Sequence, residues 1–294
     1  MAEWTIHLLE TPEEMVAVEN LQRLVWPGSE TDVIPSHMLL AAIHSGGLAL
    51  GAFVGKQLVG VVFGFPGFYT TPDGPRLKHH SHILGVLPKW NSKGIGFALK
   101  RAQWQMVRKQ GLDRITWTYD PLLSRNAHLN ISRLGAVCNT YLKSEYGEMR
   151  DGLNIGLPSD RFQLDWWVNS KRVERRLSRH FRPALTFDHY RKAEATLLIG
   201  QIDQRSMLHP PEKAISPAGK LLLVEIPFDF PSLRVLNLSL AHKWRFYTRE
   251  VFENAFESGY LITDFVHHHQ RSYYVLTYKD STLQEDEENE PTLG

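Results

Sequence analysis

The stretch from His79 to Gln110 constrains the fold more than any other part of the sequence. Residues 79–86 predict a strand, and a polar turn that contains glycine follows it. From Gly94 to Gln110, apolar residues recur at helical spacing while Lys, Arg and Gln fill most other positions, which predicts an amphipathic helix. A strand that leads through a short turn into such a helix is a building block of mixed α/β folds.

The flanking sequence continues this pattern of strands and helices. A capping box, Thr11-Pro12-Glu13-Glu14, begins a helix that should end before Pro27. The other expected elements of this half are strands at 4–9, 48–54, 58–65, 114–119, 137–146 and 162–168, and helices at 37–43 and 126–134. Residues 68–77, rich in Pro, Gly and Thr, are expected to form a loop. We therefore expect a first domain at 1–168.

The second half divides into three further segments. Residues 169–219 contain a basic stretch and several prolines, and we expect a connector with one basic helix. Residues 220–280 predict a C-terminal α/β extension with a strand at 221–226, a long helix at 236–255 and a hairpin at 260–278. Residues 281–294 form an acidic tail without aromatic residues, which predicts disorder.

Composition excludes several classes of protein. The chain has 33 basic and 32 acidic residues, so its formal net charge of +1 gives no overall attraction to nucleic acid or to an acidic membrane. A single cysteine, Cys138, excludes an internal disulfide framework and any CxxC metal site. No run approaches the ~20 apolar residues that a transmembrane helix needs. We expect a cytoplasmic protein, and the sequence leaves open whether it forms a homodimer.

The turn between the strand and the helix carries the clearest chemical signal. Gly94 and Gly96 stand at the start of the helix, whose first backbone N–H groups have no partner within the helix and suit a pyrophosphate. Lys89 and Lys93 add positive charge beside it. A Walker loop, GxxxxGK(S/T), is absent, and the third glycine of a dinucleotide-binding fingerprint is replaced by Leu99.

This segment resembles the acyl-CoA loop of the GNAT acetyltransferase superfamily, whose pattern is Gln/Arg-x-x-Gly-x-Gly/Ala after a strand that ends near Val-x-Pro. Val86-Leu87-Pro88 matches the strand end and Lys93-Gly94-Ile95-Gly96 matches the loop, while Asn91 stands where the superfamily usually has Gln or Arg. A second match is Asn126, which begins a short helix that ends in Leu134-Gly135. The resemblance covers roughly the first 165 residues, and it implies a GNAT-like mixed α/β fold. The acyl-CoA contacts that it implies are Leu84, Gly85, Val86, Asn91, Ser92, Lys93, Gly94, Ile95, Gly96 and Asn126.

The resemblance also implies direct attack of an amine on the thioester of acyl-CoA. Backbone N–H groups near Leu84–Val86 would hold the thioester oxygen, and no tyrosine stands where many members of the superfamily keep a general acid. Because alternate residues of a strand share a face, His80 and His82 are expected to lie on one face with Leu84 and Val86. A histidine has a suitable pKa for a general base, so His82 is the first candidate, His80 the second, and an ordered water the alternative.

The acceptor is predicted to be a small amine such as an amino acid. Over its whole length the chain resembles a GNAT subfamily with a C-terminal extension that is associated with N-acylation of amino acids, including succinyl transfer. The donor would be acetyl-CoA or succinyl-CoA, and no metal is expected. Arg125, Arg150 and Arg161 are candidates to pair with a substrate carboxylate. A non-catalytic acyl-CoA-binding module and an RNA-associated acetyltransferase remain alternatives.

Overall fold

The structure is a computed structural model that describes residues 3–28, 30–147, 156–178, 184–204, 206–214 and 216–280. The chain forms two compact units. The first comprises residues 1–117, 149–155 and 165–169, and the second comprises 118–148, 156–164 and 170–294. These units interleave along the chain, whereas the sequence predicts domains that follow one another with a boundary after residue 168. The expected disordered tail, 281–294, lies outside the described residues.

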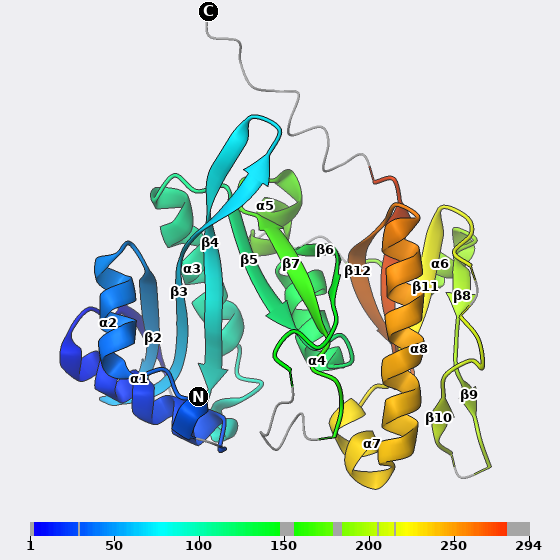
Figure 1. The fold of residues 1–294 in the computed structure, drawn as a ribbon, viewed down its shortest axis with the longest axis horizontal. Helices are drawn as coiled ribbons and strands as arrows, with labels where there is room; N and C mark the ends of the chain where they lie inside the picture. The colour runs from blue at the N-terminus through cyan, green and yellow to red at the C-terminus, as the bar shows by residue number, and fades with distance from the viewer. Residues whose placement is uncertain are drawn as a thin grey trace, which may run out of the picture. The chain divides into compact units, whose positions relative to one another are not determined.

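The first unit contains a mixed sheet. Its strands are β1 (Thr5–Leu8), β2 (Leu48–Val54), β3 (Gln57–Thr71), β4 (Gly74–Val86) and β5 (Arg114–Tyr119, to Trp117 in this unit), in the order β1-β2-β3-β4-β5 (Figure 1). Neighbouring strands are antiparallel except β4 and β5, which are parallel. The predicted mixed α/β fold class is therefore confirmed.

Helices cover both faces of this sheet. They are α1 (Pro12–Val25), α2 (Ser36–His44) and α3 (Ile95–Lys109), with 3₁₀ turns η1 (Glu30–Asp32) and η2 (Pro88–Trp90). The capping box of α1 is present, because Glu14 N–H donates to Thr11 Oγ1 and Thr11 N–H donates to a Glu14 carboxylate oxygen. A Cβ placed on Gly60 would meet α3, and a Cβ on Gly85 would meet Trp26 at the end of α1. The α1 end and α3 thus lie on opposite faces.

The loop expected at 68–77 is instead the tip of a long hairpin. Strand β3 continues to Thr71, β4 begins at Gly74, and the two pair without a break to the turn. The hairpin is the cyan pair that extends beyond the neighbouring strands in Figure 1. Contacts distant in sequence hold the hairpin near its tip: the Arg114 guanidinium lies 4.5 Å from the Tyr69 ring centroid, and the Tyr69 hydroxyl is 3.3 Å from a carboxylate oxygen of Asp113. Local sequence patterns do not predict contacts between residues so far apart in the chain.

The second unit contains a sheet in the order β7-β6-β12-β13-β11-β8. Its strands are β6 (Val137–Leu142), β7 (Arg161–Trp167, to Leu164 in this unit), β8 (Thr196–Leu198), β11 (Leu221–Ile226), β12 (Tyr260–His268) and β13 (Arg271–Tyr278). A separate pair consists of β9 (Gln201–Ile202) and β10 (Leu208–His209). The predicted strand at 221–226 and the hairpin at 260–278 are present.

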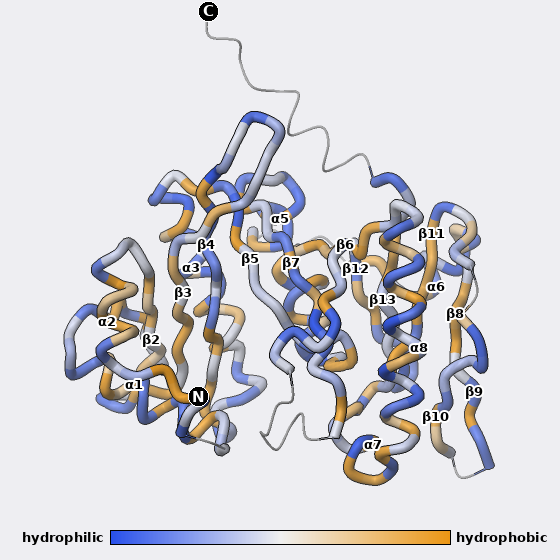
Figure 2. Tube along the Cα trace, viewed as in Figure 1, coloured by the Kyte–Doolittle hydropathy of each residue, from blue (hydrophilic) through white to orange (hydrophobic). Residues whose placement is uncertain are grey.

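The helices of the second unit are α4 (Ser124–Ala127), the π-helical η3 (His128–Arg133), α5 (Lys171–Leu177), α6 (Phe187–Lys192), α7 (Phe230–Leu236) and α8 (Leu238–Glu257). Hydrophobic and hydrophilic residues alternate along α8, as in a half-buried helix (Figure 2). Leu240, Trp244 and Val251 are buried on the helix, which packs on β6 and β12. Within the described ranges, no helix has the length and apolarity needed to cross a bilayer.

Candidate functional site

The turn that begins α3 depends on a glycine at position 94. Gly94 has φ +82°, in the left-handed region, and a Cβ there would meet no atom within 4 Å. Its requirement for glycine is therefore conformational rather than steric. Gly96 differs, because a Cβ on it would lie 4.0 Å from Leu84 and Val86, an ordinary contact. The residues from Asn91 to Gly94 are all exposed.

The N-terminus of α3 presents backbone donors to this exposed turn. No side chain caps the helix, and its first internal hydrogen bond is donated by Ala98 N–H to the Gly94 carbonyl at 3.0 Å. The N–H groups of Ile95 and Gly96 precede that bond and have no partner within the helix. They carry the positive end of the helix dipole, so this turn fits a bound phosphate or diphosphate.

Strands β4 and β5 diverge beside this turn. Their parallel ladder consists of two pairs, His79 with Ile115 and His80 with Thr116. Beyond His80, β4 remains paired with β3 as far as Val86, but its other edge has no ladder with β5. A strand edge of this kind offers backbone N–H and C=O groups to a ligand.

A β-bulge at His82 changes the direction of the side chains along β4. Ile83 pairs with Phe63 and Ser81 pairs with Gly64, so His82 is an extra residue on β4. Because a bulge of one residue reverses the alternation of faces, the expectation that the histidines share a face with Leu84 and Val86 is wrong. Leu84 and Val86 face α3, whereas His80 and His82 lie on the opposite face beside Phe65, with ring centroids 5.3 and 5.7 Å from it.

Both histidines on that face have lowered pKa values. Burial, followed by the neighbouring His82, lowers the pKa of half-buried His80 to about 4. The side chain of His82 is partly exposed, and burial of the rest of its ring lowers its pKa from the usual value. Both imidazoles are therefore neutral at pH 7, the form that a general base requires.

The opposite face of β4 holds a buried polar network that the sequence analysis missed. The Lys100 amine donates to Ser81 Oγ at 3.0 Å and to Gln103 Oε1 at 2.9 Å, and it lies 3.6 Å from the Trp117 ring centroid. Burial holds the pKa of Lys100 well below its usual value. The spacing of positions 96, 100, 103 and 107 is a signal for this network, because they form one stripe of a helix, but Lys and Gln are residue types typical of an exposed helix face.

His79 completes this network. Its Nε2 lies 3.1 Å from Gln103 Nε2, so the imidazole accepts from the Gln103 amide and carries its own proton on Nδ1. Burial, followed by the charge of Lys100, lowers the pKa of His79 to about 3. A Cβ on Gly64 would approach His79 Nε2 to 2.3 Å, so the ring occupies the space that the glycine leaves.

The remaining predicted site residues belong to the second unit or are not described. Arg125 and Asn126 are exposed on α4. Arg161 is buried; its Nη1 donates to the Asp160 carbonyl at 2.8 Å and its guanidinium lies 5.3 Å from the Tyr146 ring centroid. Arg150 lies outside the described residues.

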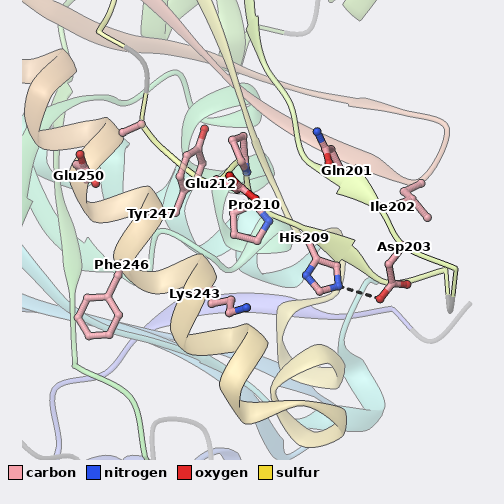
Figure 3. A pocket seen from close by; sticks show the side chains of 12 residues that line it. Gln201, Ile202, Asp203, His209, Pro210, Glu212, Lys243, Phe246, Tyr247 and Glu250 are labelled. Carbon is pink, nitrogen blue, oxygen red and sulfur yellow. Dashed lines mark hydrogen bonds and ion pairs between the residues drawn. The ribbon is translucent and has the colours of Figure 1, made fainter.

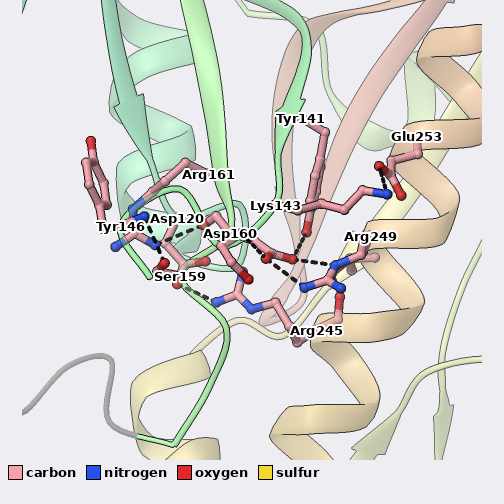
Figure 4. Close-up of polar contacts among 12 residues, drawn as sticks. Asp120, Tyr141, Lys143, Tyr146, Ser159, Asp160, Arg161, Arg245, Arg249 and Glu253 are labelled. Carbon is pink, nitrogen blue, oxygen red and sulfur yellow. Dashed lines mark hydrogen bonds and ion pairs between the residues drawn. The ribbon is translucent and has the colours of Figure 1, made fainter. Parts of the chain in front are cut away.

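The second unit has polar features of its own that the sequence did not reveal. Arg249 donates two hydrogen bonds of 2.8 Å to buried Asp160, and Arg245 pairs with Asp120 at 2.5 Å (Figure 4). Burial opposes ionisation of Asp160, but the hydrogen bonds from Arg249, the Ser144 N–H and the Tyr141 hydroxyl, with the charge of Arg245, together outweigh it and lower the pKa of the carboxyl. These two ion pairs connect α8 to Asp120 and Asp160 within the second unit.

A groove of about 670 Å³ lies between α8 and the β9–β10 pair (Figure 3). It has acidic, basic and aromatic walls, and His209 pairs with Asp203 across 2.9 Å. Among the described residues, no group of three or more His, Cys, Asp and Glu side chains is placed to hold a metal ion.

No family model matches this chain, and no curated protein matches it. Among solved structures, it is similar to a GNAT-family acetyltransferase from Streptococcus pneumoniae, with 17% identity, a TM-score of 0.44, and coverage of 55% of this chain and 98% of that one.

Two further solved structures have comparable likeness. The ribosomal-protein-S18-alanine N-acetyltransferase from Escherichia coli is 13% identical, with a TM-score of 0.43 and coverage of 62% of this chain and 100% of that one. The IAA acetyltransferase from Bacillus cereus is 17% identical, with a TM-score of 0.42 and coverage of 56% and 99%. All three of these neighbours are acetyltransferases by name.

Proposed function

We propose that this chain is a CoA-dependent N-acyltransferase that moves an acetyl or succinyl group from acyl-CoA to the amine of a small molecule, an amino acid. The observation that carries the proposal is the first unit's combination of two features. The edge of β4 is unpaired beyond His80, and it leads into an uncapped helix N-terminus whose turn requires Gly94. Acyl-CoA needs both, a strand edge for its thioester arm and a donor-rich turn for its diphosphate.

Each part of the site has a role in this proposal. The N–H groups of Ile95 and Gly96, with Lys93, bind the diphosphate, and Asn91 and Ser92 shape the turn. Backbone N–H groups within Leu84–Val86 donate to the thioester oxygen and stabilise the charge that develops there during attack. Acyl-CoA supplies the activated acyl group. His82, neutral at pH 7, takes a proton from the incoming ammonium, and His80 is the second candidate for that step. The amine then forms the C–N bond as the C–S bond breaks, and CoA leaves as a thiolate that takes a proton from water.

The acceptor is the less constrained part of the proposal. A chain with a net charge of +1 offers no steering toward a polyanion, which favours a small acceptor. An amino acid and a succinyl group each carry a carboxylate, and Arg125, Arg150 and Arg161 are the proposed partners, with Asn126 on the donor side. We further propose a cytoplasmic location and no resident metal.

No observation favours the RNA-associated alternative. In the basic stretch, Arg172 donates to the Gly135 carbonyl at 3.0 Å and Arg176 pairs with Asp264 at 2.9 Å. These two arginines of α5 are therefore engaged within the second unit rather than free for a phosphate backbone.

A thiol-release assay tests the proposal. Purified protein is mixed with acetyl-CoA or succinyl-CoA and with pools of amino acids, and free CoA thiol is measured. We expect release that depends on an amino-acid pool. CoA binding without release would favour the non-catalytic module, and transfer to protein or RNA alone would refute the proposed acceptor.

A further inference from the structure

Lys78 lies on the same face of β4 as the two candidate bases. Lys78 and His80 are alternate residues of β4, and the pairing with β3 is continuous between them, so their side chains share a face. A Cβ on Gly67, the partner of Lys78 on β3, would lie 3.8 Å from Lys78 Cε and 3.9 Å from its Cγ. The side chain of Lys78 therefore extends across β3 over this glycine rather than along β4 toward His82.

The ammonium of Lys78 has no counter-ion of its own. The charges that act on it are those of Arg114 and Asp165. Arg114 Nε and Nη2 both donate to Asp165 Oδ1, at 2.8 and 2.5 Å, so this carboxylate is already engaged. Lys78 forms no ion pair with any residue in the described part of the chain. Burial, followed by the charge of Arg114, lowers the pKa of Lys78, and an anion bound beside the ammonium would offset both effects.

Two rings line the strip of this face between Lys78 and His82. They belong to Phe65 and His80, whose ring centroids are 5.3 Å apart. The His82 ring lies 5.7 Å from the Phe65 ring and 5.8 Å from the His80 ring. Phe65, His80 and Lys78 are half-buried and His82 is exposed, so the strip is open to a ligand. Ring surfaces of this kind suit the methylene groups of a bound molecule.

The spacing between Lys78 and His82 is long for an α-amino acid. His82 falls between the residues that pair with Gly64 and Phe63, three to four positions along β3 from Gly67. At a strand rise of about 3.3 Å per residue, this separation is about 10–13 Å. An α-amino acid has a single carbon atom between its amine and its carboxylate, so it does not reach both side chains. An amino acid whose amine stands at the far end of a methylene chain does.

We propose that the acceptor is an ω-amino acid, whose carboxylate pairs with Lys78 while its distal amine lies at His82. The inference rests on the proposed function and names the acceptor of the same site. The methylene chain lies over the two rings of the strip. The chemical step is unchanged, since the amine that gives its proton to His82 forms the C–N bond as CoA leaves. Lys78 thus takes, within the first unit, the role for which Arg125 and Arg161 of the second unit are the other candidates.

A homologous series of acceptors tests this inference. The series is glycine, β-alanine, γ-aminobutyrate, δ-aminovalerate and ε-aminocaproate, with acetyl-CoA or succinyl-CoA, whichever the wild type uses, as donor. Thiol release gives kcat/KM for each acceptor. In the wild type, we expect kcat/KM to rise about tenfold or more from glycine to the better of the two longest members, because only these reach both side chains. A maximum at glycine, or equal values along the series, would overturn the inference.

Variants of Lys78 identify the group that binds the carboxylate. Lys78→Met should raise KM for ε-aminocaproate about tenfold or more, the loss of one charge-assisted contact, with CoA affinity within about twofold of the wild type. This rise should be absent with n-pentylamine, which is the same amine without the carboxylate. Lys78→Arg should keep KM for ε-aminocaproate within about fivefold, since a guanidinium also pairs with a carboxylate.

The matched control is Lys56→Met, which removes an exposed lysine from the turn between β2 and β3 of the same unit. It should leave KM for ε-aminocaproate within about twofold of the wild type, because a distant exposed charge is screened. A rise in KM in Arg125→Met but not in Lys78→Met would assign the carboxylate to the second unit and overturn the inference.

The outcomes separate this inference from the proposed function. Absence of thiol release with every amine would refute both. Release with α-amino acids alone, or an unchanged KM for ε-aminocaproate in Lys78→Met, would overturn the inference while the N-acyltransferase function stands. The acceptor series uses the wild type, so it decides the question even if Lys78→Met does not fold.

Discussion

His79 and His82 are three residues apart on one strand, yet they occupy opposite environments. His79 is enclosed between β4 and α3, where Gln103 and Lys100 surround it and its pKa falls to about 3. His82 emerges on the other face with its ring beside Phe65 and part of its side chain in solvent. The bulge produces this contrast, because it turns His82 away from the side that α3 covers.

On one face of β4 the polar side chains are buried against α3 and contribute to stability. On the other face the histidine side chain reaches solvent and is available for chemistry. On the α3 face, Lys100, Ser81, Gln103 and His79 bind one another in the core, so changes there should alter stability. On the other face, a neutral imidazole with access to solvent can exchange a proton with a substrate.

Replacing the exposed histidine should reduce turnover strongly. His82→Ala removes the proposed base, and we expect kcat to fall about a hundredfold or more, the usual contribution of a positioned general base. CoA affinity should stay within about twofold, since the change removes no contact proposed for the diphosphate. Steady-state kinetics by thiol release, with calorimetry for CoA, measures both values. Unchanged kcat in His82→Ala would remove this residue from the mechanism.

The pH dependence of kcat/KM in the wild type also tests whether His82 is the base. Because the pKa of His82 is lowered, its base form persists as the pH falls to 6.5, and the acid limb of kcat/KM should lie below that value. An acid limb above pH 7 would point to a different base.

The buried histidine should instead govern stability in acid. The pKa of His79 is about 3 in the folded state and near 6.5 when unfolded, so the unfolded chain binds the additional proton between these values. The free energy of unfolding should therefore fall as the pH drops from 6.5 toward 3, by at most ~1.4 kcal/mol per pH unit from this residue. His80, with a pKa of about 4, adds to the slope over the upper part of this window.

Urea denaturation at pH 7, 5 and 4 measures that slope. His79→Gln should flatten it, whereas His37→Gln, which changes an exposed histidine on α2, should leave it unaltered. An equal slope in wild type and His79→Gln would show that His79 does not stay neutral in the folded protein.

Two glycines of β3 should differ in how much stability the protein loses when each is replaced by alanine. Gly64→Ala would place a Cβ 2.3 Å from His79 Nε2 and should cost about 1–3 kcal/mol of stability. Gly67→Ala would place a Cβ no nearer than 3.8 Å, to Lys78, and should cost less than about 0.5 kcal/mol. Chemical denaturation of both variants provides the test, and equal stability of the two would contradict the tight packing described for the α3 face.

Much of the first unit was predictable because its signals are local. The capping box at Thr11, the helix that begins at Gly94 and the strand at 114–119 follow from spacing and turn chemistry within a few residues. The bulge at His82 was not predictable, because it depends on how β3 pairs with β4 rather than on the sequence of either strand. The burial of Lys100 was missed for a related reason, since only tertiary packing shows that Ser81 and Gln103 satisfy its amine.

The division of the chain into two units also depends on contacts between residues that are distant in the sequence. Residues 118–148 belong to the second unit, although the strand and helix signals there continue those before them. Long-range contacts decide this membership, such as the hydrogen bond between the Tyr119 and Tyr274 hydroxyls at 2.9 Å. No periodicity within a window of residues encodes a contact across 155 positions.

The proposed binding of acyl-CoA at the turn of Gly94 can be tested by calorimetric titration of CoA into a matched pair of glycine variants. Gly94 and Gly111 flank the two ends of α3, both are exposed with positive φ, and a Cβ on either would meet no atom within 4 Å. Gly94→Val and Gly111→Val therefore impose similar backbone strain. We predict that Gly111→Val binds CoA like the wild type and that Gly94→Val shows no measurable binding. Wild-type affinity in Gly94→Val would contradict the account.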